Sequence, residues 1–198
     1  MEEFVDKEGF GIYNINIHRN FLEPSCQTKR DETKTTRKVD QIMACTAIVG
    51  INWGDEGKGR MVDLLTEAFD VVVRFQGGGN VSHEVINQYG RFKLHTLPSG
   101  VCRKGVVNIL GNGVALDPES LAKEIEDVKA KGIEITPDNL KISDRASLLL
   151  PWHRQLDALE EARLKDKKFG STKQGIAPFY SDKYQKKTIM AGELFYPK

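Results

Sequence analysis

Residues 46–60 read TAIVGINWGDEGKGR, and this stretch decides how the rest of the chain is interpreted. Residues 46–52 form a short apolar run with β-branched side chains, which predicts a buried strand. The loop that follows has glycines at positions 54, 57 and 59 and leads into a predicted helix. A strand, a glycine-rich loop and a helix in this order present free backbone N–H groups at the helix N-terminus, where they can cradle a phosphate.

Predicted strands and helices alternate along the chain beyond this loop. Strands are expected at residues 70–75, 91–97, 106–110 and 140–142, and helices at 61–68, 117–132 and 151–164. The second helix has an apolar stripe that includes Leu121 and Val128, and the third aligns Trp152, Leu156 and Leu159. The alternation predicts an α/β fold with a mostly parallel β-sheet and flanking helices.

The loop at residues 53–60 matches no standard phosphate-binding motif. GxxxxGK[ST] would need glycine in place of Asn52 and serine or threonine in place of Gly59, and GxGxxG does not fit. Lys58 would add a point charge to a bound phosphate. A phosphate ligand and an ordinary glycine-containing turn both remain open.

Asp55 lies inside this loop, where a carboxylate would repel a bound phosphate. Mg²⁺ removes the conflict, because this ion takes one or two carboxylates together with phosphate oxygens. The carboxylate could instead accept a proton from a substrate as a general base, and the two roles are compatible. A solvent-exposed turn aspartate is the third interpretation.

A second loop, residues 77–84 (GGGNVSHE), follows the strand predicted at 70–75. Loops at the carboxyl ends of parallel strands line the ligand crevice of an open sheet. If the strands at 46–52 and 70–75 are neighbours, His83 and Asp55 face the same crevice. His83 would then donate a proton to a transferring phosphoryl group or stabilise it; a purely structural histidine is the alternative.

A third cluster, residues 169–178 (FGSTKQGIAP), is rich in glycine and hydroxyl side chains. This composition suits a loop that grips a phosphate, and it suits an ordinary surface turn equally well.

Composition excludes several classes of protein. The 198 residues are 39% hydrophobic and 29% charged, which is typical of a globular protein with a sizeable core. The net charge of +1 gives no sign of nucleic-acid binding, and the apolar runs are too short for a membrane helix. Cys26, Cys45 and Cys102 form no disulfide framework or zinc pattern, so we expect a cytoplasmic protein with reduced thiols.

The first 42 residues differ from the rest. Residues 25–40 (SCQTKRDETKTTRKVD) contain almost nothing that could be buried, which predicts a disordered segment. Met43, where the globular pattern starts, is either the natural first residue or the end of a real flexible extension.

Six segments together resemble the adenylosuccinate synthetase family: WGDEGKGR, VDLLTE, VVVRFQGG, LHTLPSG, ILGNGV and GSTKQGIAPFYSDKY. The resemblance covers roughly residues 44–195 and implies a P-loop-like GTP-binding architecture. It also implies GTP-dependent ligation of IMP and L-aspartate to adenylosuccinate through 6-phosphoryl-IMP, with Mg²⁺, in a homodimer of purine nucleotide biosynthesis.

Family members are considerably longer than this chain. Residues 43–198 are therefore expected to be the N-terminal part of the synthetase domain, and residues 1–42 a disordered or non-family extension. We expect weak or no synthetase activity from residues 1–198 alone. The alternative function is an inactive fragment or a non-catalytic purine-nucleotide-binding module.

The resemblance also implies residue roles. Asp55 corresponds to the general base and His83 to the acid that stabilises phosphoryl transfer. Mg²⁺ ligands are expected at Asp55 and at the backbone carbonyl of Ser82. The GTP-binding residues implied are Gly54, Asp55, Glu56, Gly57, Lys58, Gly59, Arg60, Ser82, His83 and Glu84. The IMP-binding residues implied are Asp55, Glu56, Gly57, Lys58, Asn80, Val81, Ser82, His83, Thr172 and Lys186.

Three residues depart from the family pattern. Residues 80–84 read NVSHE where the family has NAGHT. Ser82 replaces a glycine and would be strained by a positive φ. Glu84 replaces a threonine and brings a negative charge near the phosphates, and Lys186 replaces an arginine and loses its bidentate geometry.

Overall fold

The computed structural model describes residues 3–5, 11–16, 44–51, 56–87, 90–167 and 170–196. The chain divides into two compact units, Met1–Lys58 and Gly59–Lys198. The run predicted to be disordered, residues 25–40, lies outside the described residues, and so does Cys26. The predicted domain boundary after residue 42 therefore stays a prediction.

The first unit contains a three-stranded antiparallel sheet. Its strands are β1 (Glu3–Val5), β2 (Gly11–Asn16) and β3 (Ala44–Ile48), in the order β1-β2-β3. The strand predicted at residues 46–52 is thus present as β3, but its partner is β2, with Ile12 opposite Ile48. Asp55 lies outside the described residues, so the expectation that it shares a crevice with His83 stays a prediction.

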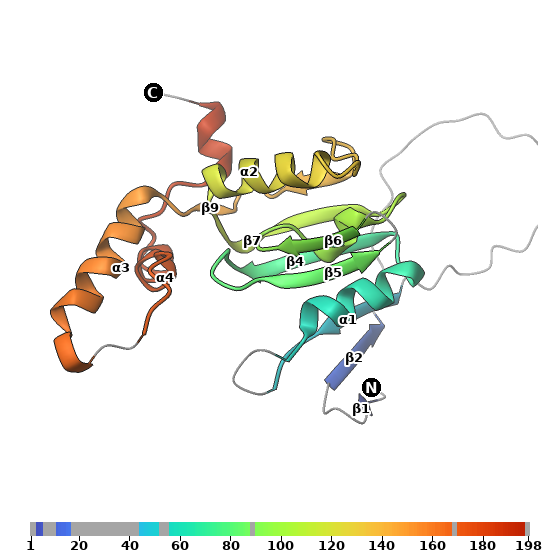
Figure 1. Ribbon diagram of the computed structural model, residues 1–198, viewed down its shortest axis with the longest axis horizontal. Helices are drawn as coiled ribbons and strands as arrows, with labels where there is room; N and C mark the ends of the chain where they lie inside the picture. The colour runs from blue at the N-terminus through green and yellow to red at the C-terminus, as the bar shows by residue number, and fades with distance from the viewer. Residues whose placement is uncertain are drawn as a thin grey trace, which may run out of the picture. The chain divides into compact units, whose positions relative to one another are not determined.

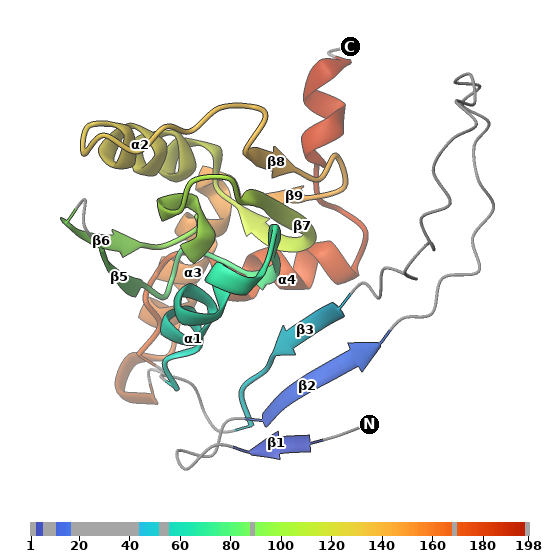
Figure 2. The same cartoon turned by 90° about the vertical axis from the view of Figure 1, so that its right-hand side faces the viewer.

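The second unit is built on a parallel sheet, which Figures 1 and 2 show with its helices. Its strands are β4 (Val71–Gly77), β7 (Val107–Leu116), β8 (Leu140–Ile142) and β9 (Ser147–Leu148), with β7 hydrogen-bonded to the other three. All three pairings are parallel, and Val71 lies opposite Val107 at the start of the β4–β7 ladder. The α/β fold with a parallel sheet is confirmed.

A separate antiparallel hairpin contains β5 (His83–Asn87) and β6 (Gly90–Leu94). The strand predicted at residues 91–97 is β6. The prediction that residues 77–84 form a loop is wrong at its end, because His83 and Glu84 begin β5 opposite Leu94 and Lys93. Val85 of this hairpin is buried. The sequence did not predict β5, because the strand closely follows three consecutive glycines.

Helices and 3-10 turns complete the second unit. They are α1 (Lys58–Leu65), η1 (Thr66–Ala68), η2 (Ser99–Cys102), α2 (Pro118–Lys129), α3 (Pro151–Arg163), η3 (Lys165–Lys167), α4 (Ile176–Tyr184) and η4 (Ala191–Phe195). The three predicted helices are confirmed as α1, α2 and α3, whereas α4 was not predicted, and its first residues, 176–178, belong to the cluster interpreted as a loop. In the described part of the chain, no helix is long and apolar enough to cross a bilayer.

The main hydrophobic core lies under α2. Asp117 caps this helix by accepting a hydrogen bond from the Ser120 N–H, and Pro118 stands at its start, where proline needs no N–H partner. Leu121 and Val128 of α2 pack in one cluster with Phe92 and Leu94 of the hairpin.

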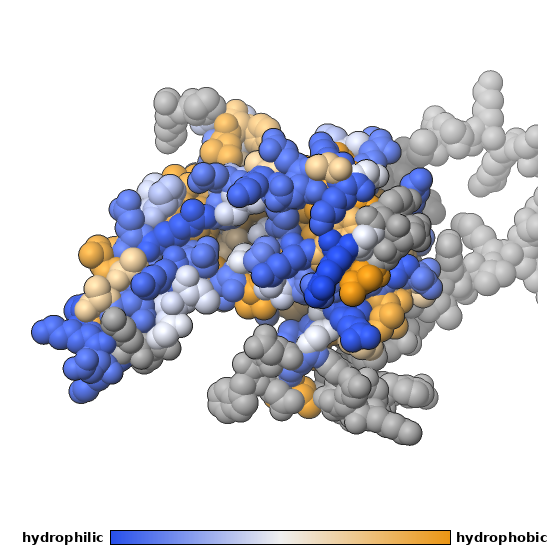
Figure 3. Space-filling view, in the orientation of Figure 1, coloured by the Kyte–Doolittle hydropathy of each residue, from blue (hydrophilic) through white to orange (hydrophobic). Residues whose placement is uncertain are grey.

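Figure 3 shows a mostly hydrophilic surface in this view, with apolar side chains near α3 and near the C-terminal turn η4.

Candidate functional site

The glycine-rich loop of residues 54–60 is described in part. Gly54 and Asp55 lie outside the described residues, so their predicted roles stay predictions. Gly57 immediately precedes α1, and Lys58 and Arg60 belong to its first turn. The Lys58 ammonium forms an ion pair with the Glu56 carboxylate at 2.5 Å. The predicted phosphate-binding cation is thus held by an acidic side chain of the same loop.

Gly59 and His83, two predicted site residues, lie in direct contact. A Cβ atom on Gly59 would be 2.5 Å from Cβ and Cγ of His83, which is closer than any side chain tolerates. The Gly59 carbonyl accepts a hydrogen bond from the Ser99 hydroxyl at 2.8 Å. The imidazole therefore rests on the first turn of α1 at a position that only glycine can occupy without displacement.

The environment of His83 keeps its imidazole uncharged at neutral pH. Burial, followed by the positive charge of Arg74 and by the neighbouring His95, lowers the pKa of His83 from 6.5 to about 4. Its Nε2 atom is buried and has no hydrogen-bond partner among the described residues. A neutral imidazole offers one N–H donor and one acceptor nitrogen, so this ring can still donate a hydrogen bond to an oxygen placed against it.

Arg74 and Glu124 form the polar interior beside His83. The Arg74 guanidinium donates hydrogen bonds to the carbonyl oxygens of His95 and of Gly78, the latter at 2.8 Å. Burial lowers the pKa of Arg74, and the negative charge of Glu124 opposes that shift. Sequence reasoning missed both residues. The available signal was an arginine inside an apolar strand, DVVVRF, where a charge is costly unless the fold supplies partners.

Glu124 fixes the chain that follows β6. Its carboxylate accepts hydrogen bonds from the backbone N–H groups of His95, Thr96 and Leu97 at 2.7, 2.9 and 3.3 Å. A buried carboxylate on α2 therefore holds the segment whose carbonyl oxygen at His95 binds Arg74. The contacts make one connected polar network between α2, β4 and the segment after β6.

The residues that depart from the family pattern fit this structure. Among the described non-glycine residues, positive φ occurs at Lys165, Lys173 and Lys186, so Ser82 carries no such strain. Glu84 is paired with Arg91, at 2.6 Å from Nε and 2.7 Å from Nη2. Hydrogen bonding to Arg91 lowers the pKa of Glu84, and its negative charge is thereby partly balanced on the exposed hairpin.

The third predicted cluster and the helix that follows it meet the end of β4, where a Cβ on Gly78 would lie 2.6 Å from Cδ1 of Ile176. The Tyr180 hydroxyl on α4 accepts a hydrogen bond from the Gly77 N–H at 3.0 Å and donates one to the Gly113 carbonyl at 2.9 Å. Burial raises the pKa of Tyr180. The glycine-rich turn after β4 and the start of α4 are therefore brought together.

Five other predicted site residues lie in exposed or half-buried loops. Asn80 is half-buried, and Val81 and Ser82 are exposed, in the turn between β4 and β5. Thr172 is exposed before α4, and Lys186 is exposed beyond its other end with a φ of +61°. The nine-residue helix α4 lies between Thr172 and Lys186 along the chain.

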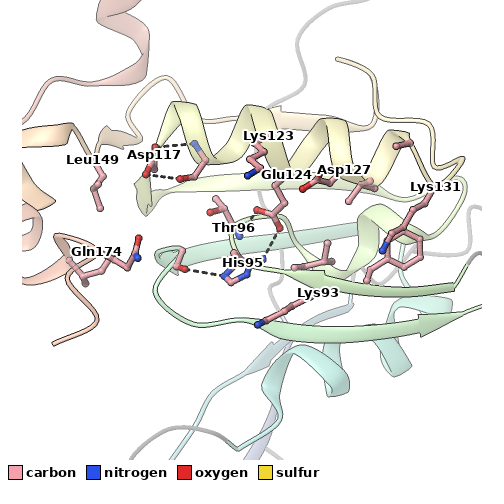
Figure 4. A pocket seen from close by; sticks show the side chains of 17 residues that line it. Lys93, His95, Thr96, Asp117, Lys123, Glu124, Asp127, Lys131, Leu149 and Gln174 are labelled. Carbon is pink, nitrogen blue, oxygen red and sulfur yellow. Dashed lines mark hydrogen bonds between the residues drawn. The ribbon is translucent and has the colours of Figure 1, made fainter. Parts of the chain in front are cut away.

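The chain also contains a cleft of about 720 Å³ between β6, α2 and the loop before α4 (Figure 4). Lys93, Lys123 and Asp127 are among the charged residues that line it. Among the described residues, none of those predicted above for catalysis, nucleotide binding or Mg²⁺ binding lines this cleft. The cleft nevertheless borders the loops that the sequence indicated, because Gly79 of the second loop and Gln174 of the third cluster line it, together with Glu124.

The predicted metal site consists of oxygen donors. Mg²⁺ typically takes one or two protein oxygens and completes its shell with substrate phosphates and water, so the carboxylate of Asp55 and the carbonyl of Ser82 are chemically suitable. The described residues contain no cluster of three or more His, Cys, Asp or Glu side chains arranged for a metal. Cys45 is exposed and Cys102 is buried, and burial raises the pKa of Cys102 to about 12.

Comparisons with known proteins identify the family. The family model for adenylosuccinate synthetase matches residues 47–198. The chain belongs to the adenylosuccinate synthetase family. Adenylosuccinate synthetase of Clostridium acetobutylicum is 46% identical over 156 residues, and that of Caldanaerobacter subterraneus is 51% identical over 144 residues. These alignments cover 79% and 73% of this chain but 36% and 34% of the relatives. The chain thus spans about a third of the length of the curated relatives it matches.

Solved structures agree with this assignment. Fully ligated adenylosuccinate synthetase from Plasmodium falciparum matches with a TM-score of 0.65 and 40% identity, over 72% of this chain and 33% of that one. Succinoaminodeoxyadenylate synthetase of cyanophage S-2L matches with a TM-score of 0.55 at 22% identity, which shows a shared fold alone. The family resemblance noted in the sequence is confirmed.

Proposed function

We propose that this chain carries the part of an adenylosuccinate synthetase that holds nucleotide phosphates and transfers protons during ligation of IMP to L-aspartate. The family match across residues 47–198 is the observation that carries this proposal. The direct contact between His83 and Gly59 supports it, because this contact joins the predicted acid to a residue of the predicted phosphate loop.

The chemistry explains why a phosphate donor is required. The 6-oxygen of the hypoxanthine ring is a poor leaving group. Asp55 removes the ring proton, the 6-oxygen attacks the γ-phosphate of GTP, and GDP leaves. The amine of aspartate then displaces the 6-phosphate as inorganic phosphate, which yields adenylosuccinate. His83 donates a hydrogen bond or a proton to the phosphoryl group as it transfers.

The remaining roles follow the family pattern. Residues 54–60 bind the GTP phosphates, with Ser82 and Glu84 nearby; residues 55–58 and 80–83 also contact IMP, and Thr172 contacts its phosphate. Mg²⁺, bound by Asp55 and Ser82, would balance negative charge on the phosphates. Lys186 would reach the IMP of a neighbouring subunit in a cytoplasmic homodimer, which fits its separation from Thr172 along α4.

A non-catalytic purine-nucleotide-binding module is the second candidate. It needs only residues such as 54–60 and 80–83, which this chain contains. Phosphoryl transfer requires charge stabilisation from several sides, whereas binding of one nucleotide requires fewer contacts.

Two measurements on the 198-residue chain separate these candidates. Calorimetric titration with IMP, and with inosine as the control that lacks phosphate, measures nucleotide binding. Absorbance of adenylosuccinate, followed with IMP, GTP, L-aspartate and Mg²⁺, measures turnover. Turnover abolished by Asp55→Asn, and reduced at least about 10²-fold by His83→Asn, supports the ligase. IMP binding without turnover supports the module, and equal binding of IMP and inosine, or binding of neither, overturns both.

A further inference from the structure

The loop of residues 170–175, which contains Thr172, lies along the buried polar side of α3. Asp157 and Glu161 are 6% and 5% exposed, one helical turn apart. The Glu161 carboxylate accepts a hydrogen bond from the Gly170 N–H at 3.3 Å. The loop is therefore anchored to α3 at its first residue and again by Asp157.

Asp157 holds the loop at two points on either side of Thr172. Its Oδ1 atom accepts a hydrogen bond from the Ser171 hydroxyl at 2.6 Å, and its Oδ2 atom accepts one from the Gly175 N–H at 2.8 Å. The three residues between these anchors, 172–174, are exposed. One buried carboxylate thus ties both ends of a short exposed segment and sets its shape.

The segment has little freedom to adopt another path. The Ser171 hydroxyl also accepts a hydrogen bond from the Lys173 N–H at 3.1 Å, and Lys173 has a φ of +56°. Gly175 has a φ of +78°, and a Cβ there would lie 2.7 Å from the backbone nitrogen of Arg154. Backbone contact with α3 and the two Asp157 hydrogen bonds therefore specify the same loop conformation.

We propose that Asp157 is the positioning residue that holds Thr172 for contact with the phosphate of a bound nucleotide. This inference rests on the proposed function, in which Thr172 contacts the phosphate of IMP. Asp157 acts through Ser171 and Gly175 and does not itself touch the ligand. Alanine in place of Asp157 removes both acceptors, whereas asparagine could keep both contacts, because its amide oxygen can accept from Gly175 while its N–H donates to the Ser171 hydroxyl.

Hydrogen exchange and nucleotide titration of the full chain test the two halves of this proposal. Asp157→Ala should speed amide exchange of Gly175 at least about tenfold, because the opening of a locally held loop controls exchange there. The same variant should weaken IMP binding at least about tenfold and leave inosine binding unchanged, since only IMP has the phosphate. Glu160→Gln, on the exposed side of the same helix, is the matched control and should change neither quantity.

Ser171 variants guard against simple unfolding of the Asp157 variant. Ser171→Ala should weaken IMP binding, and Ser171→Thr, which keeps the hydroxyl, should restore it. Unchanged exchange at Gly175 in Asp157→Ala would overturn the positioning role, and so would a loosened loop with undiminished IMP affinity. If the wild-type chain binds no IMP, the proposed function fails for this chain, and exchange alone decides whether Asp157 holds the loop.

Discussion

Helices α2 and α3 have 12 and 13 residues and both begin with proline, yet they bury opposite kinds of side chain. The buried residues of α2 are Leu121, Glu124 and Val128, two of them apolar. The buried residues of α3 are His153, Asp157 and Glu161, none of them apolar. The aligned apolar residues Trp152, Leu156 and Leu159 are 47%, 48% and 66% exposed.

The difference follows from what each helix packs against. α2 covers the apolar side chains of the hairpin and the sheet. α3 faces a loop with backbone N–H groups that require acceptors, and α4, whose Asp182 lies 3.4 Å from the His153 imidazole. A buried backbone donor costs free energy unless it is paired, so α3 buries its carboxylates there. Apolar alignment along a helix therefore marks the buried face only when the partner surface is apolar as well.

The largest loss of stability should come from truncating an apolar side chain on the buried face of α2. Leu121 is 4% exposed within the main cluster, and Leu121→Ala should lower the free energy of unfolding by about 2–5 kcal/mol. Urea denaturation monitored by circular dichroism measures this change. A loss below about 1 kcal/mol would show that α2 is not packed as the structure has it.

The polar interior beside α2 should make stability depend on pH. The pKa of His83 is about 4 in the folded chain and 6.5 when unperturbed, so between these values only the unfolded chain binds the proton. The free energy of unfolding contributed by this group is therefore present above pH 6.5 and falls as pH drops toward 4. We expect a loss of about 1–3 kcal/mol.

Denaturant titrations at pH 7 and pH 4.5 measure this loss in wild type and in His83→Gln. The difference between the two proteins isolates the imidazole, because the carboxylates titrate in both. Equal losses in wild type and variant would contradict a buried neutral His83.

An ion pair joins the two helices and should give a smaller effect. Arg154 of α3 contacts the Asp117 carboxylate at the N-terminus of α2 and donates a hydrogen bond to the Ser120 hydroxyl at 3.0 Å. A double-mutant cycle with Arg154→Met and Asp117→Asn should give a coupling free energy of about 0.5–1.5 kcal/mol. Additive single and double variants, within the error of the unfolding measurements, would show that the pair does not link α2 to α3.

The smallest effect should come from the apolar side of α3. Leu159 is 66% exposed, and Leu159→Ala should change the free energy of unfolding by no more than about 0.5 kcal/mol. It is the same substitution as Leu121→Ala on a helix of similar length, so the pair of variants measures the comparison directly. A loss similar to that of Leu121→Ala would mean that this side of α3 is covered in solution.

Local pattern was enough to predict much of the second unit. The strands at β4, β7 and β8 and the helices α1, α2 and α3 all lie where apolar periodicity, proline and glycine indicated. The family was also evident, because the glycine-rich segments occur in a fixed order along the chain. These features depend on residues close in sequence, and local periodicity reports them directly.

Tertiary structure alone decided which elements pair or pack with one another. No local pattern connects β3 with β2, or β5, which begins at His83, with β6. The same is true of the contact between the His83 imidazole and Gly59. The polar side of α3 is buried because donors from residues 170–175, which lie beyond the end of that helix, need acceptors. Periodicity tells which residues share a face of an element, but the chemistry of the surface packed against it determines which face is buried.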